Sequence, residues 1–299
     1  MQQKTGYAAI IGKPNSGKST LMNVIMGVKL SIVTPKPQTT RKRILGIHST
    51  ESTQIIFLDT PGMIKPRYKL QSKMMAHVAS SLDQADVIVL LLDAAEYLSE
   101  ERGFHSSIID SIKRTGKPAI LVLNKTDLLH DKKALLPVID EMSKTGTFTD
   151  IIPISALRAD NIDSLLILIE KYLPEMPFLF DPEMLATQPE RFFVAEIIRE
   201  QVFLEFEQEI PYSVEIVIVE FKEREEGKWF ISAEIVVDKK SQKGMMIGEK
   251  GRKIKLIGEK SRSEIERHLE REVFLELFVK VRENWRNDER MLGSFGYNL

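Results

Sequence analysis

The stretch Gly12–Ser19, GKPNSGKS, decides the fold of the first half of the chain. It matches the pattern G-x-x-x-x-G-K-[ST], follows a β-like run at 7–12 (YAAIIG) and opens a helix-like stretch at 18–27 (KSTLMNVIMG). Glycines in such a loop let backbone N–H groups turn inward around phosphates, and the positive end of the following helix faces the same anion. We therefore predict a phosphate-binding loop, with Lys18 on the β- and γ-phosphates and Ser19 on Mg²⁺.

Short apolar runs alternate with helix-like stretches through the first half of the chain. Such runs suit strands in a mostly parallel sheet whose two faces are covered by helices. They lie at 7–12, 54–59, 86–93, 119–124 and 150–155. The alternation predicts a doubly wound α/β domain. Because binding residues in such domains gather at the carboxyl ends of strands, the residues that follow each run are the candidates.

The pattern changes around the proline-containing stretch PEMPFLFDPEMLATQP at 174–189. Beyond it a helical stretch precedes two β-like runs joined by EREEG, and then come a basic helical region and a last strand, VFLELFVKV. This order predicts a smaller α+β domain with a hairpin. The predicted division is a first domain at 1–175, a linker at 176–188 and a second domain at 189–299.

Charge and composition restrict the class of protein. The net charge of −1 gives no global attraction to nucleic acid or membrane, so any such patch must be local. The absence of cysteine excludes disulfides and cysteine-based zinc sites and fits a reducing cytosol. Apolar runs such as 87–92 are too short to span a bilayer. We expect a cytoplasmic protein, with peripheral contact to the inner membrane as the only membrane association left open.

Asp59 ends the run 54–59 and leads into Thr60-Pro61-Gly62. An aspartate there can hold Mg²⁺ while the Gly62 N–H meets the γ-phosphate. A plain Pro-Gly turn is the alternative interpretation.

Two further strand ends carry groups suited to guanine. In NKTD, at 124–127, Asp127 can accept hydrogen bonds from guanine N1 and N2, Asn124 would brace the neighbouring loops, and the Lys125 stem can lie along the base. In SAL, at 155–157, the Ala156 N–H can meet guanine O6. Adenine lacks this hydrogen-bonding edge and would leave the Asp127 carboxylate unpaired. Because an unpaired polar group is costly, guanine is favoured over adenine.

These motifs, together with QTTR at 38–41, resemble those of the translation-factor-related small GTPases. The resemblance implies that a threonine in QTTR closes over Mg²⁺, and we favour Thr40 over Thr39; two solvent-facing threonines are the alternative. The predicted catalytic residues are Lys18, Thr40, Asp59 and Gly62, and the predicted metal ligands are Ser19, Thr40 and Asp59. The predicted GTP- and GDP-binding residues are Gly12, Asn15, Ser16, Gly17, Lys18, Ser19, Thr20, Asp59, Gly62, Asn124, Lys125, Asp127, Ser155 and Ala156.

The second domain contains MIGEKGRKIKLIG at 246–258, which resembles the core of a KH domain. In that module Gly248 and Gly251 let a nucleic-acid backbone approach between two helices. Residues 239–262 hold nine Lys or Arg against two Glu, a local excess that RNA binding requires, although a solvated helix face would also explain the charges alone. The element order indicates the type II KH topology. The predicted RNA-binding residues are Ile247, Gly248, Glu249, Lys250, Gly251, Arg252, Lys253 and Lys255.

The combination of a guanine-nucleotide domain and a type II KH domain resembles the Era family over nearly the whole chain. The resemblance implies binding to the 3′ end of 16S rRNA during maturation of the 30S ribosomal subunit, by a monomer whose GTP form favours RNA. A GTPase whose second domain docks a protein or a membrane instead is the alternative. Trp285 could stack on a base or pack within its own domain.

Met63 follows the DTPG motif, where a side chain often aligns the attacking water. A thioether cannot do so, and we find no arginine finger in the sequence, so we expect slow intrinsic hydrolysis. In related GTPases an asparagine at the position of Asn15 helps to hold K⁺, and the ion supplies the positive charge that an arginine finger would otherwise provide. A turn asparagine that supports its own loop explains Asn15 equally well.

Overall fold

The computed structural model describes residues 3–99 and 103–298. Contacts divide the chain into two compact units. The first comprises Met1–Lys65 with Met74–Thr187, and the second comprises Pro66–Lys73 with Gln188–Leu299. Each unit has its own sheet and its own hydrophobic core.

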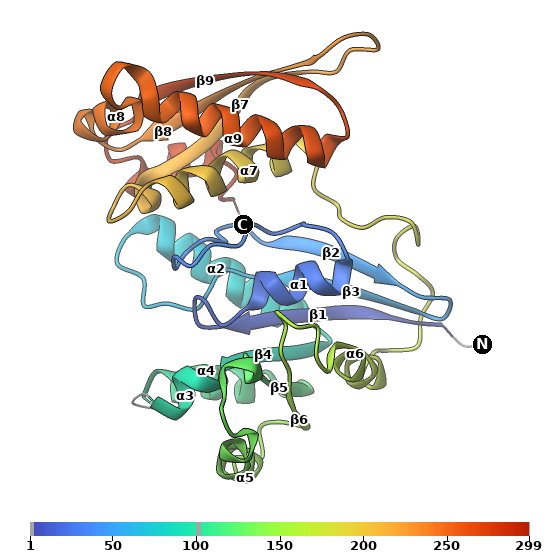
Figure 1. Cartoon of the computed structure of the whole chain (residues 1–299). Helices are drawn as coiled ribbons and strands as arrows, with labels where there is room; N and C mark the ends of the chain where they lie inside the picture. Colours follow the sequence, from blue (N-terminus) through green and yellow to red (C-terminus); the bar gives the residue numbers. More distant parts are fainter. Residues whose placement is uncertain (1–2, 100–102, 299) are drawn as a thin grey trace. The chain divides into compact units, whose positions relative to one another are not determined.

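A six-stranded sheet in the order β2-β3-β1-β4-β5-β6 forms the centre of the first unit (Figure 1). β2 runs antiparallel to β3, and the other pairs are parallel, which confirms the predicted mostly parallel sheet. The strands are β1 (Lys4–Gly12), β2 (Ile44–Ser49), β3 (Thr53–Asp59), β4 (Val87–Asp93), β5 (Ala119–Asn124) and β6 (Asp150–Pro153).

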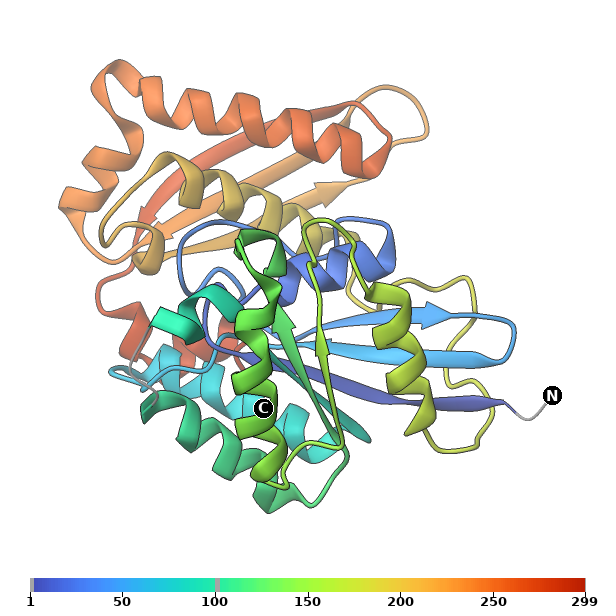
Figure 2. The same cartoon turned by 60° about the horizontal axis from the view of Figure 1, so that its bottom comes forward.

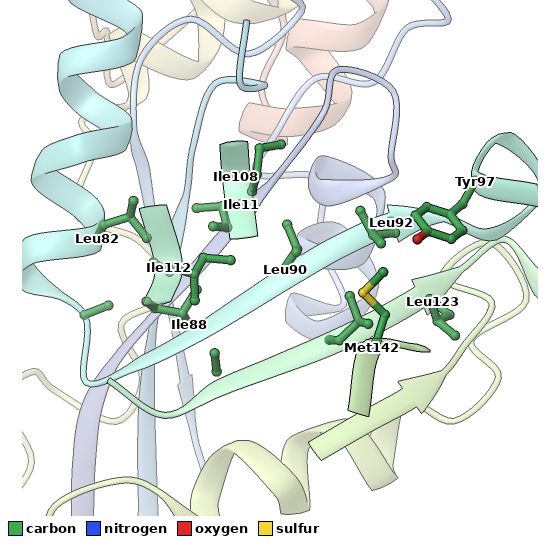
Figure 3. Packing of buried hydrophobic residues seen from close by; sticks show 14 of the residues in the cluster. Ile11, Leu82, Ile88, Leu90, Leu92, Tyr97, Ile108, Ile112, Leu123 and Met142 are labelled. Carbon is green, nitrogen blue, oxygen red and sulfur yellow. The ribbon is translucent and has the colours of Figure 1, made fainter. Parts of the chain in front are cut away.

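Helices cover both faces of this sheet. On one face, the apolar side chains of β1, β4 and β5 pack against Leu82, Ile112 and Met142, which come from α2, α4 and α5 (Figure 3). On the other face α1 lies over β2. The two elements approach closely at Gly46, where an added Cβ would lie 2.4 Å from the Met22 side chain. The helices are α1 (Lys18–Met26), α2 (Lys69–Gln84), α3 (Ala94–Ser99), α4 (Gly103–Thr115), α5 (Leu136–Lys144) and α6 (Ile162–Lys171).

The second unit has a three-stranded sheet in the order β7-β8-β9, with β7 antiparallel and β9 parallel to β8. α7, α8 and α9 lie on one face of this sheet (Figure 2), and their apolar residues pack against it. Its elements are α7 (Glu190–Glu205), β7 (Val214–Lys222), β8 (Trp229–Val237), α8 (Lys240–Ile247), α9 (Arg252–Leu269), β9 (Val273–Val281) and α10 (Glu289–Ser294). This order confirms the predicted α+β KH architecture.

The predicted linker and Trp285 both have defined surroundings. The stretch 174–187 runs along the first unit, where the Gln54 amide bonds to the backbone of Leu179 and Phe180 and Ile47 N donates to Leu185 O (2.8 Å). Trp285 is fully buried in the second unit and donates from Nε1 to Ser213 O (3.1 Å), so its ring packs within its own unit.

Within 3–99 and 103–298, no helix combines the length and the apolar character needed to cross a bilayer.

Candidate functional site

The carboxyl ends of β1, β3, β4 and β5 lie at one edge of the first sheet. The register pairs Ile10 with Asp59 and Asp93 with Asn124, which brings the predicted motifs to this edge. They border a cleft of about 370 Å³, within the range of small-molecule sites. Its lining is Pro14, Asn15, Gly17, Lys18, Ser19, Thr20, Ile32, Val33, Thr34, Pro35, Gln38, Thr39, Thr40, Gly62 and Lys125.

Lys18 lies at the N-terminus of α1 with its ammonium folded into the phosphate loop. Nζ donates to the carbonyls of Lys13 (2.7 Å) and Gly12 (3.3 Å). Burial lowers the pKa of Lys18 to about 8, and the nearby Asp59 carboxylate opposes that shift. A bound phosphate would add a directly contacting anion to this buried cation, whose hydrogen bonds go to two backbone carbonyls.

Ser19, Thr40 and Asp59 converge at the predicted metal position. Ser19 Oγ lies 2.8 Å from Thr40 Oγ1 and donates to Asp59 Oδ2 (3.0 Å). Thr39 turns away instead, with its hydroxyl on Lys36 O and on Thr34 Oγ1 (both 2.7 Å). The geometry therefore places Thr40, rather than Thr39, beside the other two groups.

Asp59 has the chemistry that Mg²⁺ requires. Its carboxyl is buried, which raises its pKa, while bonds from Ser31, the charge of Lys18 and a bond from Ser19 oppose the shift. Oδ1 is buried and accepts no hydrogen bond within the described part of the chain. One carboxylate oxygen, two hydroxyls and the phosphates of a nucleotide are the oxygen donors that Mg²⁺ takes in such sites, so these residues fit the ion.

Ser31 and Asn23 support Asp59, and the sequence analysis missed both. Ser31 is fully buried and donates from Oγ to Asp59 Oδ2 (2.7 Å). The Asn23 side chain holds the Ser31 backbone through Nδ2 to Ser31 O (2.7 Å) and Oδ1 from Ser31 N (2.8 Å). Neither residue belongs to a recognisable motif, so only the folded chain identifies this support.

Gly62 is brought against the phosphate loop by a close backbone approach. A Cβ at this position would lie 2.7 Å from both Cα and N of Pro14, so any side chain would force the two loops apart. The next residue, Met63, donates its N–H to Gly12 O (2.9 Å), and its side chain packs against the hydrophobic core. The thioether is therefore a packing group here.

One buried amide connects the predicted base loop and the phosphate loop. Asn124 Nδ2 donates to Ser16 O (2.8 Å), and Asn124 Oδ1 accepts from Ala156 N (2.9 Å). The Asp127 carboxylate is exposed and accepts from Ser155 Oγ. These contacts bring together four of the five residues predicted for guanine and its surroundings, Asn124, Asp127, Ser155 and Ala156, although the Ala156 N–H that was predicted to meet guanine O6 here donates to Asn124.

Two other residues complete the description of the nucleotide cleft. Lys125 pairs with Asp93 at 2.7 Å, a contact the sequence analysis missed although Asp93 directly follows an apolar run. Asn15 has a left-handed backbone (φ 62°) and donates from Nδ2 to Pro35 O (2.9 Å). This bond links the two loops that border the cleft and leaves the choice between a K⁺ ligand and a turn asparagine open.

The GxxG segment of the second unit forms a tight turn between α8 and α9. Gly248 and Gly251 both have left-handed φ values, 71° and 77°. A Cβ on Gly248 would lie 2.8 Å from Lys253 Cγ, whereas one on Gly251 would meet nothing within 4 Å. The backbone of Gly251 is therefore the open part of the turn, which is where a phosphodiester chain could approach.

The predicted RNA-binding residues do not share one surface. A cleft of about 330 Å³ lies between α9 and β9, and Lys255 lines it together with Ile254 and Arg262. Lys253 instead places its ammonium 4.7 Å from the centre of the Phe206 ring, on the side of α8. The remaining predicted residues, Ile247, Glu249, Lys250 and Arg252, surround the turn itself.

Comparisons with known proteins agree with both units. A family model described as a 50S ribosome-binding GTPase matches residues 7–125, and a KH domain model matches residues 209–286. GTPase Era from Syntrophus aciditrophicus is 45% identical over 296 residues, covering 99% of this chain and 95% of that protein. GTPase ERA1, chloroplastic, from Zea mays is 44% identical, covering 98% of this chain and 70% of its own.

Two solved structures match the chain over nearly its full length. A variant of Aquifex aeolicus Era bound to GDP and AlF₄⁻ gives a TM-score of 0.95 at 42% identity, covering 99% of this chain and all of that one. An Era structure in complex with MgGDPNP and nucleotides 1506–1542 of 16S ribosomal RNA gives the same score, identity and coverage. With a nucleotide cleft in one unit and a GxxG turn in the other, this chain belongs to the Era family of GTPases.

Proposed function

We propose that this protein is a slowly hydrolysing GTP switch that binds single-stranded 16S rRNA near its 3′ end and promotes assembly of the 30S subunit. It acts as a cytoplasmic monomer, with a GTPase domain at 1–175, a linker at 176–188 and an RNA-binding domain at 189–299. The observation that carries the proposal is the convergence of Lys18, Ser19, Thr40 and Asp59 on one cleft, in a chain that also has an open GxxG turn.

Different residues contact the phosphates, the guanine base and the metal ion. The phosphate loop and Lys18 hold the phosphates, and Asp127 reads the guanine edge. Ser19, Thr40 and Asp59 would hold Mg²⁺, which would supply positive charge to the phosphates of the nucleotide. Gly62 meets the γ-phosphate through its N–H, so the loop that follows it senses whether a third phosphate is present.

Slow hydrolysis follows from the position of Met63. Its side chain packs against the core and has no group that orients water, so the alignment of water falls to backbone groups. Stabilisation of the developing charge comes from Lys18 and the phosphate-loop amides. If Asn15 Oδ1 is a K⁺ ligand, the bound K⁺ would add to this stabilisation of charge. A comparison of the hydrolysis rates in K⁺ and in Na⁺ decides between the two roles of Asn15.

RNA is favoured over a protein or a membrane as the ligand of the GxxG turn. The turn carries Lys250 and Arg252 beside the open backbone of Gly251, and the cleft next to it has Lys255 and Arg262 on its wall. Cations around an exposed backbone turn suit a phosphodiester chain. Binding that rests on such contacts weakens steeply as salt increases.

Crosslinking to cellular RNA, with the protein loaded with GTP or GDP, tests the proposal. Sequencing of the captured RNA should show enrichment of the 16S 3′ end, and the GTP form should capture more of it. Titrations of a 3′-end fragment against the GTP, GDP and nucleotide-free forms give the corresponding affinities. Equal affinity in all three forms would refute the switch, and capture of unrelated RNA would refute the assignment of the ligand.

A further inference from the structure

The sheet of the second unit has an inner and an outer face, because side chains alternate along each strand. On β9, Val273, Leu275 and Leu277 point to the inner face and pack in the core with the helices. The alternate positions of the same strand, Phe274 and Phe278, therefore point to the outer face. On β8 the corresponding outer residues are Phe230, Ser232, Glu234 and Val236.

The C-terminal segment covers one half of the outer face. Tyr297 is 1% exposed and donates from its hydroxyl to Glu215 Oε2 (2.7 Å), a buried outer residue of β7. Val236, which pairs with Glu215 in the register, is 2% exposed. This half of the face is thus part of the packed interior of the unit.

The other half carries exposed aromatic rings. Phe274 is 53% exposed and Phe278 is 52% exposed, which are high fractions for such large apolar side chains. The Phe230 ring stacks on Phe274 with centroids 6.0 Å apart and planes 15° apart. We call Phe230, Phe274 and Phe278 the aromatic half-face. Large exposed apolar groups that cluster on one surface mark interaction sites more often than singly exposed ones.

Carboxylates lie between these rings. The register places Glu276 and Glu220 on either side of Ser232, and Glu234 beside Phe278. Glu220 pairs with Lys222, and Glu234 pairs with Lys280, but Glu276 has no ion pair within 3–99 and 103–298. The adjoining loop, EREEG at 223–227, adds three exposed glutamates and one arginine. Four cations lie on the same surface, namely Lys222, Arg224, Lys228 and Lys280, against six glutamates on these strands and the loop, so the surface has a small acidic excess, in contrast to the basic region around the GxxG turn.

The charge decides which class of partner fits. A nucleic acid or an anionic lipid surface would be repelled by the carboxylates. An arginine guanidinium can stack on a phenylalanine ring and pair with a carboxylate at the same time. A cation already takes such a position here, because Lys222 Nζ lies 5.9 Å from the centre of the Phe230 ring.

We propose that the aromatic half-face is a docking site for an arginine-rich protein segment. Arginine side chains of the partner stack on Phe274 and Phe278 and pair with Glu276, while apolar side chains of the partner cover the remaining ring surface. The site is separate from the GxxG turn, so one unit holds a cationic surface for RNA and an acidic, aromatic surface for protein.

A labelled synthetic peptide of alternating arginine and leucine tests the site on the full-length protein. Fluorescence anisotropy should show saturable binding that weakens at least tenfold in Phe274→Ser/Phe278→Ser and in Glu276→Lys. The matched control is Gly251→Asp, which alters the GxxG turn and should bind the peptide like the unsubstituted protein. Because both phenylalanines are more than half exposed, the double variant should unfold at an unchanged temperature, which a thermal melt checks.

Three outcomes would overturn the proposal: no binding of the peptide, equal binding by the double variant, or loss of RNA binding in that variant. A second arm rests on the proposed function and uses purified small ribosomal subunits and protein-free 16S rRNA. The double variant should bind the subunits at least tenfold more weakly and the protein-free rRNA equally well. If the unsubstituted protein binds neither subunits nor rRNA, the proposed function fails, while the peptide result still decides the docking site.

Discussion

Replacing Ser31 by alanine should weaken Mg²⁺ binding without weakening nucleotide binding in the absence of the metal. Ser31 Oγ donates to Asp59 Oδ2 at 2.7 Å, and both residues are fully buried. The other side-chain donor to that oxygen is Ser19, which is itself a predicted metal ligand. When Ser19 turns to the metal, the bond from Ser31 is the side-chain bond that still orients the carboxylate, beside a backbone bond from Thr60.

The size of the effect follows from the kind of bond that is lost. A hydrogen bond to a charged group contributes about 1.5–3 kcal/mol, and each 1.4 kcal/mol corresponds to about a tenfold change in affinity. We therefore expect Ser31→Ala to lower the affinity of the GDP complex for Mg²⁺ roughly 10- to 100-fold, the range that is typical for partners of metal ligands.

Dissociation of a fluorescent GDP analogue, measured across a titration of Mg²⁺, gives the metal affinity directly. The midpoint of the titration should move to higher Mg²⁺ in Ser31→Ala, whereas dissociation rates in excess EDTA should match those of the unsubstituted protein. If Ser31 only stabilises its loop, the substitution would speed up nucleotide dissociation by the same factor in Mg²⁺ and in EDTA. That result, or an unchanged midpoint, would refute the positioning role.

Substitutions at four further positions test the other assignments. Lys18→Ala should abolish binding of GDP and GTP in isothermal titration, because the buried cation that meets the phosphates is lost; retained affinity would mean that the phosphate site is misplaced. Asp127→Asn should shift preference from guanine to xanthine nucleotides in competition binding, and an unchanged preference for guanine would exclude Asp127 as the reader of the base. Gly251→Asp should abolish binding of single-stranded RNA, while Gly251→Asn, which also tolerates the left-handed backbone, should retain more of it; equal losses would show that shape rather than charge decides. Single-turnover GTP hydrolysis should be slow in Na⁺; a K⁺-ligand role of Asn15 predicts faster hydrolysis in K⁺ that Asn15→Ala removes, whereas a turn asparagine predicts equally slow hydrolysis in both salts; fast hydrolysis in both salts would contradict both the slow switch and the K⁺ ligand.

Much of the fold could be predicted because the relevant signals are local. The five apolar runs became β1, β3, β4, β5 and β6, since strands covered on both faces need apolar residues at nearly every position. The antiparallel edge strand β2 was not among them. Its sequence, ILGIHS, is short and mixes apolar and polar residues, and its pairing with β3 depends on a neighbour in space.

The supporting contacts of the site could not be predicted in the same way. Ser31 reaches Asp59 only because the loop after α1 folds back, and no spacing rule connects those positions. The side chain of Lys253 turns to Phe206, a residue at the end of α7, so a basic residue near the GxxG turn does not face the same cleft as Lys255. On β9, Phe274 and Phe278 share the outer face with Glu276, but the sequence alone does not show that no other element covers the two rings.

The bridge made by Asn124 has a consequence for any attempt to redesign nucleotide choice. Its single amide fixes the carbonyl of Ser16 and the N–H of Ala156, so the grip on the phosphates and the shape of the purine pocket cannot be altered one at a time through this residue. With the proposed roles, we expect altered purine selectivity with intact phosphate affinity from changes at Asp127, which is exposed and takes no part in this bridge.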